Sequence, residues 1–354
     1  MAIAIDCSNI SSDGAVALND GLIEEIANSY SAGTRVYLFC NNEYTPSISV
    51  ENFEIVRINH SNRIPHFLWY VFVLNKLLRR LNCKNLYLLG GYYLGVFRPY
   101  SALFQNLLPF ETEIVKRYPF WMRRKLFLLS RFYKYSFQNA ERFYFLTKHT
   151  TKYFDDRILS AIEPSFIPFR IVVKTNSRLA TVTENSFMRF LYVANITEYK
   201  NHRNLVKAFA IVYKRSPKIK LTLIGKKVGK HSEKILEDIF NINSAKEFLN
   251  YAGYIPRENI TEYYQTHCCL IYPSLVESLG VPLYEAMLFD LPILCSDKIS
   301  LVPILEIGND DNSRFGKFSY INEADDKTRS YKKVKYFDPY NVDSIVKSIE
   351  EFIG

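Results

Sequence analysis

The chain has 354 residues, of which 48% are hydrophobic and 15% aromatic, and its net charge is +9. This composition excludes an intrinsically disordered protein, and the length suits two domains of ordinary size. The longest apolar run, residues 67–74, is far shorter than the roughly 20 residues that a membrane-spanning helix needs. We therefore expect a cytoplasmic protein, or a peripheral one on the inner face of the cytoplasmic membrane. No recognisable nucleic-acid-binding module accompanies the basic charge, so we expect no nucleic acid partner.

The first half of the chain alternates strand-like and helix-like segments. A turn at residues 11–14 and a helix at residues 16–30 separate two predicted strands. The predicted strands of this half are residues 2–6, 35–40, 54–58, 86–89, 101–105 and 142–146. This rhythm is typical of a doubly wound parallel sheet, so we expect an α/β domain over residues 1–170. A linker at residues 171–186 and a second domain at residues 187–354 should follow.

Residues 118–135 combine basic and aromatic side chains. A helix here would place its cations on one side and an apolar stripe on the other. The cations are Arg123, Arg124, Arg131 and Lys134, and the stripe is Met122, Leu126, Leu129 and Tyr133. Such a helix can lie on an anionic membrane surface. It can equally pack its stripe on the domain core and leave its cations in water, and the residues alone leave both interpretations open.

The most informative stretch of the second half follows a predicted strand at residues 268–272. A helix is predicted at residues 281–289 and a further strand at residues 291–295, which together make a β-loop-α-β unit. Ligands of open parallel sheets bind at the carboxyl ends of the strands, and Glu277 falls at such an end. The loop around Glu277 is therefore a candidate ligand site.

Two acids and a helix start lie close together in this loop. Gly280 allows a tight turn and Pro282 suits the first helical position, so main-chain amides there can face a diphosphate. Glu277 and Glu285 would repel a phosphate, but they can accept hydrogen bonds from the hexose and ribose hydroxyls of a sugar nucleotide. The alternative is an ordinary amphipathic helix whose two acids are merely solvated.

The segment IYPSLVESLGVPLYEAMLFDLPILCSD, with its E-x7-E pattern at Glu277 and Glu285, resembles the donor site of the family-four retaining glycosyltransferases. FLYVANITEYKNHRNLVKAF is similar to the strand-loop-helix that opens the donor domain of that family. The resemblance implies the GT-B fold, in which two facing Rossmann-like α/β domains enclose an interdomain cleft. It also implies transfer of a hexose from a nucleotide sugar to a saccharide acceptor in polysaccharide or O-antigen biosynthesis. Many members act on lipid-linked sugars, which favours a lipid-linked acceptor and membrane contact through residues 118–135.

The same resemblance assigns site residues. Lys200 would neutralise the departing diphosphate and Glu277 would bind the hexose, so these two are the expected catalytic residues, and Glu285 would bind the ribose. Further donor contacts are expected at Leu279, Gly280, Val281, Tyr254, Ile255, Gly14 and Lys226. Asn106 is the expected contact on the acceptor side. Retention of configuration is implied, with the departing phosphate deprotonating the acceptor hydroxyl.

Some features depart from the resembled pattern. Asn195 stands where relatives often carry an arginine, so we expect Lys226 or Lys227 to replace that cation or the chemistry to be weaker. The chain contains no Asp-x-Asp pattern, so no metal or other cofactor is expected. A polar insertion at residues 309–333 should form a surface loop. The missing arginine, and a C-terminus shorter than usual in the family, leave open a catalytically weak or inactive relative that binds nucleotide or membrane. A nucleotide-sugar epimerase of the same fold is the other alternative.

Overall fold

The computed structural model describes residues 1–10, 13–31, 33–42, 44, 46, 53–58, 68–156, 159–160, 165–166, 187–299 and 333–354. The chain divides into two compact units, the first mainly Met1–Ile171 and the second mainly Val172–Asn309 with Ile321–Gly354. The predicted linker at residues 171–186 and residues 309–332 of the predicted insertion lie outside the described residues. None of the helices in the described ranges is long and apolar enough to cross a membrane.

A parallel seven-stranded sheet forms the centre of the first unit, in the order β3-β2-β1-β4-β5-β6-β7. Its strands are β1 (Ala2–Cys7), β2 (Arg35–Cys40), β3 (Phe53–Arg57), β4 (Cys83–Leu88), β5 (Tyr100–Phe104), β6 (Arg142–Phe145) and β7 (Ser165–Phe166). The predicted strands are thus confirmed within a few residues. Helix α1 (Asp13–Asn28) begins earlier than expected, so Gly14 lies in its first turn and the predicted turn there is wrong. A glycine costs a helix only about 1 kcal/mol relative to alanine, and this one did not stop the helix.

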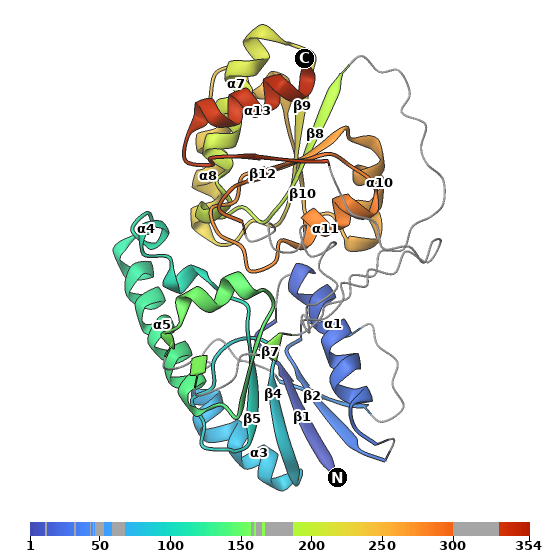
Figure 1. Cartoon of the computed structure of the whole chain (residues 1–354), viewed down its shortest axis with the longest axis vertical. Helices are drawn as coiled ribbons and strands as arrows, with labels where there is room; N and C mark the ends of the chain where they lie inside the picture. Colours follow the sequence, from blue (N-terminus) through green and yellow to red (C-terminus); the bar gives the residue numbers. More distant parts are fainter. Residues whose placement is uncertain are drawn as a thin grey trace. The chain divides into compact units, whose positions relative to one another are not determined.

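Helix α1 covers one face of this sheet, and α3 and α5 lie on the other side (Figure 1). The remaining helical segments are η1 (Trp69–Leu74), α3 (Asn75–Arg80), η2 (Leu108–Phe110), α4 (Thr112–Val115), α5 (Phe120–Asn139) and η3 (Lys148–Tyr153). The core between α5 and the sheet is built from aromatic rings. Phe104 of β5 packs edge-on against Phe137 of α5, with ring centroids 5.5 Å apart, and against Phe154 at 4.9 Å. Such edge-to-face contacts stabilise the core beyond the area they bury.

The second unit contains a parallel six-stranded sheet in the order β10-β9-β8-β11-β12-β13. Its strands are β8 (Met188–Val193), β9 (Ile219–Ile224), β10 (Leu249–Gly253), β11 (Cys269–Tyr272), β12 (Ile293–Ser296) and β13 (Val334–Phe337). Its helices are η4 (Glu198–Lys200), α7 (His202–Arg215), α8 (Lys230–Phe240), α9 (Ala245–Phe248), α10 (Arg257–Thr266), α11 (Val281–Leu288) and α13 (Val342–Ile353). Helices α7, α8 and α13 cover one face, and α10 and α11 cover the other (Figure 1).

The strand order of this second sheet is that of a Rossmann fold. The order reverses between β8 and β11, which pair directly through Leu191 and Leu270. Open α/β sheets bind ligands beside such a reversal, at the carboxyl ends of the strands. Two Rossmann-like α/β units are therefore confirmed, while the interdomain cleft stays a prediction.

Candidate active site

Lys200 and Glu277 meet at the point where the strand order of the second sheet reverses. Strand β8 leads through a short loop into η4, which ends at Lys200, and β11 leads into the loop that carries Glu277. The Leu275 N–H donates a hydrogen bond to the Tyr199 carbonyl at 2.8 Å and holds the two loops together. Pairing of β8 with β11 thus brings together two residues that are far apart in the sequence.

The Lys200 ammonium forms a short ion pair with Glu277 Oε1, and the two side chains are only 10% and 12% exposed. Tyr272 lies beside the pair: its hydroxyl accepts from Lys200 Nζ at 3.2 Å and donates to Glu277 Oε1 at 3.1 Å. Ser274 Oγ donates to the same oxygen at 2.7 Å. The other oxygen, Glu277 Oε2, has no hydrogen-bond partner among the residues that the structure describes. One carboxylate oxygen is therefore saturated by the protein and the other can accept from a ligand.

The electrostatics of the pair keep Lys200 charged. Burial lowers the pKa of Lys200, but the Glu277 carboxylate and the neighbouring Tyr199 outweigh burial and raise the pKa above its usual range. Burial and the nearby Glu277 charge also raise the pKa of Tyr272 far above its ordinary value. Tyr272 therefore remains a hydroxyl that can donate, and Lys200 supplies a fixed positive charge at neutral pH.

Glu285 lies on α11, one helix further along the chain, and it is buried. Its Oε2 accepts a hydrogen bond from the Tyr264 hydroxyl at 2.7 Å. Gly280 precedes the helix with φ +74°, a left-handed conformation in which a Cβ would lie 2.7 Å from Leu283 Cδ1. Pro282 is the second helical residue rather than the first, because α11 begins at Val281. A glycine is thus required at this turn, and the main chain of buried Leu279 and Val281 flanks it.

Three further predicted donor residues follow neighbouring strands of the same sheet. Lys226 comes after β9, and Tyr254 and Ile255 come after β10. The Lys226 ammonium lies 4.2 Å from the centroid of the Tyr254 ring, which is 46% exposed. The Lys226 N–H donates to Asn195 Oδ1 at 3.1 Å. Asn195 therefore fixes the main chain of Lys226, and the expectation that Lys226 or Lys227 supplies a further cation stays a prediction.

Gly14 and Asn106 belong to the first unit. Asn106 is exposed just after β5, and its Oδ1 accepts from the Leu108 N–H at 3.3 Å. Their roles toward donor and acceptor stay predictions.

Three polar residues of the site were not predicted from the sequence: Tyr264, Tyr272 and Ser274. Tyr272 closes an apolar strand and Tyr264 lies within an amphipathic helix, so both match the pattern of core residues. Their hydroxyl contacts depend on tertiary packing, and no local sequence signal indicates them.

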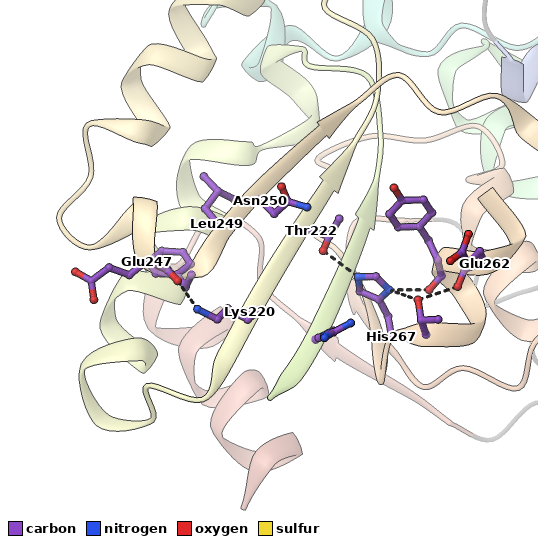
Figure 2. A pocket seen from close by; sticks show the side chains of 11 residues that line it. Lys220, Thr222, Glu247, Leu249, Asn250, Glu262 and His267 are labelled. Atoms are coloured by element: carbon purple, nitrogen blue, oxygen red, sulfur yellow. Dashed lines mark hydrogen bonds between the residues drawn. The ribbon is translucent and has the colours of Figure 1, made fainter. Parts of the chain in front are cut away.

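A cavity of about 510 Å³ lies at the opposite end of the same sheet. Lys220 and Leu249 in its wall stand at the beginning of β9 and β10, and His267 and Thr222 also line it and contact each other (Figure 2). His267 Nδ1 must carry its proton, because it contacts the Tyr263 carbonyl at 2.8 Å, and Thr222 Oγ1 then donates to Nε2 at 2.9 Å. The cavity is separate from the carboxyl-end site.

Two buried histidines of the second unit are held neutral. Burial lowers the pKa of His202 to about 3 and that of His267 to about 4. The unfolded chain binds these protons below about pH 6.5 and the folded chain does not, so stability falls as the pH drops below that value.

Between roughly pH 6.5 and pH 5, the free energy of unfolding of the wild type should decrease. In His202→Asn this decrease should be smaller by about 2 kcal/mol, because the buried imidazole is gone. Urea unfolding at both pH values measures this difference. His231→Asn is the control, because the His231 side chain is 34% exposed. An unchanged pH dependence in His202→Asn would contradict the assignment of a neutral buried imidazole.

Comparison with known proteins agrees with these features. Residues 175–312 match the family model "Glycosyl transferases group 1". O-antigen chain mannosyltransferase B of Escherichia coli is 26% identical over 115 residues, which are 32% of this chain and 30% of that protein. Alpha-monoglucosyldiacylglycerol synthase of Acholeplasma laidlawii is 27% identical over 113 residues, 32% of this chain and 27% of that protein. The chain therefore spans less than a third of the length of these two curated relatives.

Solved structures resemble the whole chain. Sucrose-phosphate synthase from Thermosynechococcus elongatus has a TM-score of 0.67 at 15% identity, with 100% of this chain and 90% of that chain covered. WaaG, a glycosyltransferase involved in lipopolysaccharide biosynthesis, has a TM-score of 0.65 at 12% identity, with 99% and 90% covered. These similarities show the fold, which is GT-B.

Proposed function

The chain carries a glycosyl transferases group 1 domain, and from this premise we propose that it is a retaining glycosyltransferase that moves a hexose from a nucleotide sugar to a saccharide acceptor. The observation that carries the proposal is the largely buried Lys200–Glu277 pair at the reversal point of the second sheet. A fixed cation there suits a diphosphate, and Glu277 Oε2, which has no hydrogen-bond partner in the described part of the chain, suits a sugar hydroxyl.

The proposed chemistry breaks the bond between the sugar C1 and the phosphate oxygen. Negative charge grows on the departing nucleoside diphosphate, and the Lys200 ammonium with the amides at the start of α11 would stabilise it. A phosphate oxygen then takes the proton of the acceptor hydroxyl as that hydroxyl attacks C1 from the same face. Because Lys200 supplies the counter-charge, we propose that no metal is needed, and that activity persists in EDTA.

Turnover of labelled nucleotide sugars tests this function. A panel screened by ligand-observed NMR identifies the donor, and product formation with and without saccharide acceptors follows. We expect transfer that requires an acceptor and that Glu277→Ala abolishes. Conversion of donor alone would indicate an epimerase instead. Donor binding without any turnover would indicate an inactive relative, and strict dependence on manganese or magnesium would contradict the site chemistry.

We further propose a lipid-linked acceptor in polysaccharide or glycolipid assembly, at the inner face of the cytoplasmic membrane. The names of two relatives, an O-antigen chain mannosyltransferase and a monoglucosyldiacylglycerol synthase, support this acceptor class. Helix α5 supports contact with an anionic surface. Its predicted stripe packs inward, with Leu126 and Tyr133 buried, yet a second apolar set faces outward beside the cations. The outward set is Phe120, Trp121, Phe127 and Leu128, each more than half exposed.

A second element extends this surface of the first unit. Phe72 of η1 is 68% exposed, and Arg79 and Arg80 follow it on α3. The Tyr92 ring contacts both Tyr70 of η1 and Phe132 of α5, so the two elements are neighbours. The sequence has no acidic residue between Glu54 and Glu111, and none in α5. Exposed apolar side chains and cations on two segments that contain no acidic residue suit an anionic bilayer.

We expect the wild-type chain to bind vesicles that contain phosphatidylglycerol and not vesicles of phosphatidylcholine alone. Each cation near such a surface contributes about 1 kcal/mol, so Arg123→Glu with Arg124→Glu should weaken binding at least about 30-fold. The matched control is Lys207→Glu with Lys214→Glu on exposed positions of α7. Vesicle cosedimentation measures the difference, and equal binding by both double variants would contradict a role for α5.

A further inference from the structure

Each of the two site carboxylates is held by one buried tyrosine. Tyr272 is 1% exposed and donates to Glu277, and Tyr264 is 2% exposed and donates to Glu285. A phenylalanine ring would fill either core position equally well, because a buried hydroxyl adds a cost in free energy unless it has a hydrogen-bond partner. The pairing of each hydroxyl with a carboxylate therefore suggests a role in the site.

Tyr272 determines how Glu277 and Lys200 face a ligand. Its hydroxyl accepts from the Lys200 ammonium and donates to Glu277 Oε1, so it bridges the cation and the anion. Ser274 donates to the same oxygen. Three protein donors thus converge on Oε1, and the carboxylate cannot rotate to offer Oε1 to a ligand without losing them. Glu277 Oε2 is therefore the oxygen that can accept a hydrogen bond from the substrate.

Tyr264 plays the matching part for Glu285. It comes from α10, and its ring stacks on Phe289 with centroids 5.5 Å apart and planes 5° from parallel. The stacked ring aims the hydroxyl at Glu285 Oε2 at 2.7 Å. Because α10 and α11 both contribute, the Glu285 carboxylate is fixed between two helices.

We infer that Tyr272 and Tyr264 are positioning residues that act on different halves of the donor. Tyr272 orients the groups for the sugar and its departing phosphate, and Tyr264 orients the group for the nucleoside ribose. This inference rests on the proposed function. It predicts that loss of the two hydroxyls has separable effects on turnover and on nucleotide binding.

The test compares Tyr272→Phe and Tyr264→Phe with Tyr100→Phe, a control that loses a buried hydroxyl bonded to the Ser136 carbonyl in the first unit. UDP and GDP serve as probes in titration calorimetry, and the donor found by screening gives kcat and KM. A hydrogen bond to a charged group predicts about a tenfold fall in kcat for Tyr272→Phe with less than about a threefold change in Kd for the diphosphate. Tyr264→Phe should instead raise that Kd about tenfold and change kcat less than about threefold.

Ser274→Ala provides a second variant, since it removes another donor from Glu277 Oε1 without touching a ring. It should shift kcat in the same direction as Tyr272→Phe and leave the diphosphate Kd unchanged. Equal changes of kcat and Kd in both tyrosine variants, or changes that Tyr100→Phe reproduces, would overturn the inference while the transferase activity stands. A wild-type chain that neither binds UDP or GDP nor turns over any nucleotide sugar would overturn the proposed function, and the inference with it.

Discussion

Replacement of Lys200 by methionine is expected to lower kcat for sugar transfer by about 10²–10³-fold, the usual effect of removing one group that stabilises transition-state charge. Methionine keeps much of the apolar stem and removes the ammonium. The free energy of unfolding should also fall, because Glu277 loses its counter-ion in a site where the side chains are only 10% and 12% exposed. The decrease should be smaller than the ~3–5 kcal/mol of a fully buried pair, since some solvent reaches both groups.

A second substitution separates these two effects. Lys200→Met combined with Glu277→Gln removes both charges, so stability should recover relative to Lys200→Met while transfer stays low. Lys207→Met on the exposed side of α7 is the matched control and should change neither quantity. Steady-state kinetics and urea unfolding give both measurements. If Lys200→Met kept kcat within about threefold of the wild type, Lys200 could not be the charge that stabilises the departing diphosphate.

Gly225→Ala is expected to lower the free energy of unfolding by about 3 kcal/mol or more, at the upper end of overpacking effects. A Cβ on Gly225 would lie 2.0 Å from the Ala194 carbonyl oxygen and 2.5 Å from its carbon. These are main-chain atoms, so the overlap is relieved only if the segments that follow β8 and β9 move apart. The Gly225 N–H also bonds to the Gly253 carbonyl at 2.8 Å, and the strain would therefore reach the end of β10.

Gly229→Ala is the control for this prediction. Gly229 has φ +71° and ψ 179°, a region that is essentially restricted to glycine, and a Cβ added there would meet no atom within 4 Å, so alanine meets only a conformational cost of about 1–3 kcal/mol. Urea unfolding of both variants compares the effect of steric overlap, in Gly225→Ala, with the effect of backbone conformation alone, in Gly229→Ala. If Gly225→Ala were no less stable than Gly229→Ala, the close approach of the β8 and β9 exits would be contradicted.

The predictable part of this protein is the part that depends on local pattern. Strand and helix positions around Glu277 follow from short apolar runs, from Gly280 and from Pro282, and the structure has them within a few residues. Lys200 was predicted from the resemblance of its segment to the donor domain of the glycosyltransferase family, and its place after a strand and a turn agrees with a position at a carboxyl end of a parallel sheet. The pairing of Lys200 with Glu277 follows once β8 and β11 are neighbours.

The unpredicted part depends on contacts between distant segments. Tyr272 and Tyr264 have the burial pattern of core residues, and only the packed structure shows that their hydroxyls meet carboxylates. The helical wheel grouped Leu126 and Tyr133 of α5 in one apolar stripe without deciding what covers it, and the structure buries both residues. Trp121 and Phe127 fell outside the two faces of the wheel. Amphipathic periodicity describes one buried stripe and gives no reason for large apolar side chains on the exposed side.

A crystal structure of the chain with a bound nucleoside diphosphate would test the proposed site in one experiment. The Lys200 ammonium should lie within hydrogen-bond distance of a phosphate oxygen, with the Glu285 carboxylate on the ribose hydroxyls and the start of α11 beside the diphosphate. A nucleotide bound with Lys200 still paired only to Glu277, or seated in the cavity around His267 at the other end of the sheet, would contradict it.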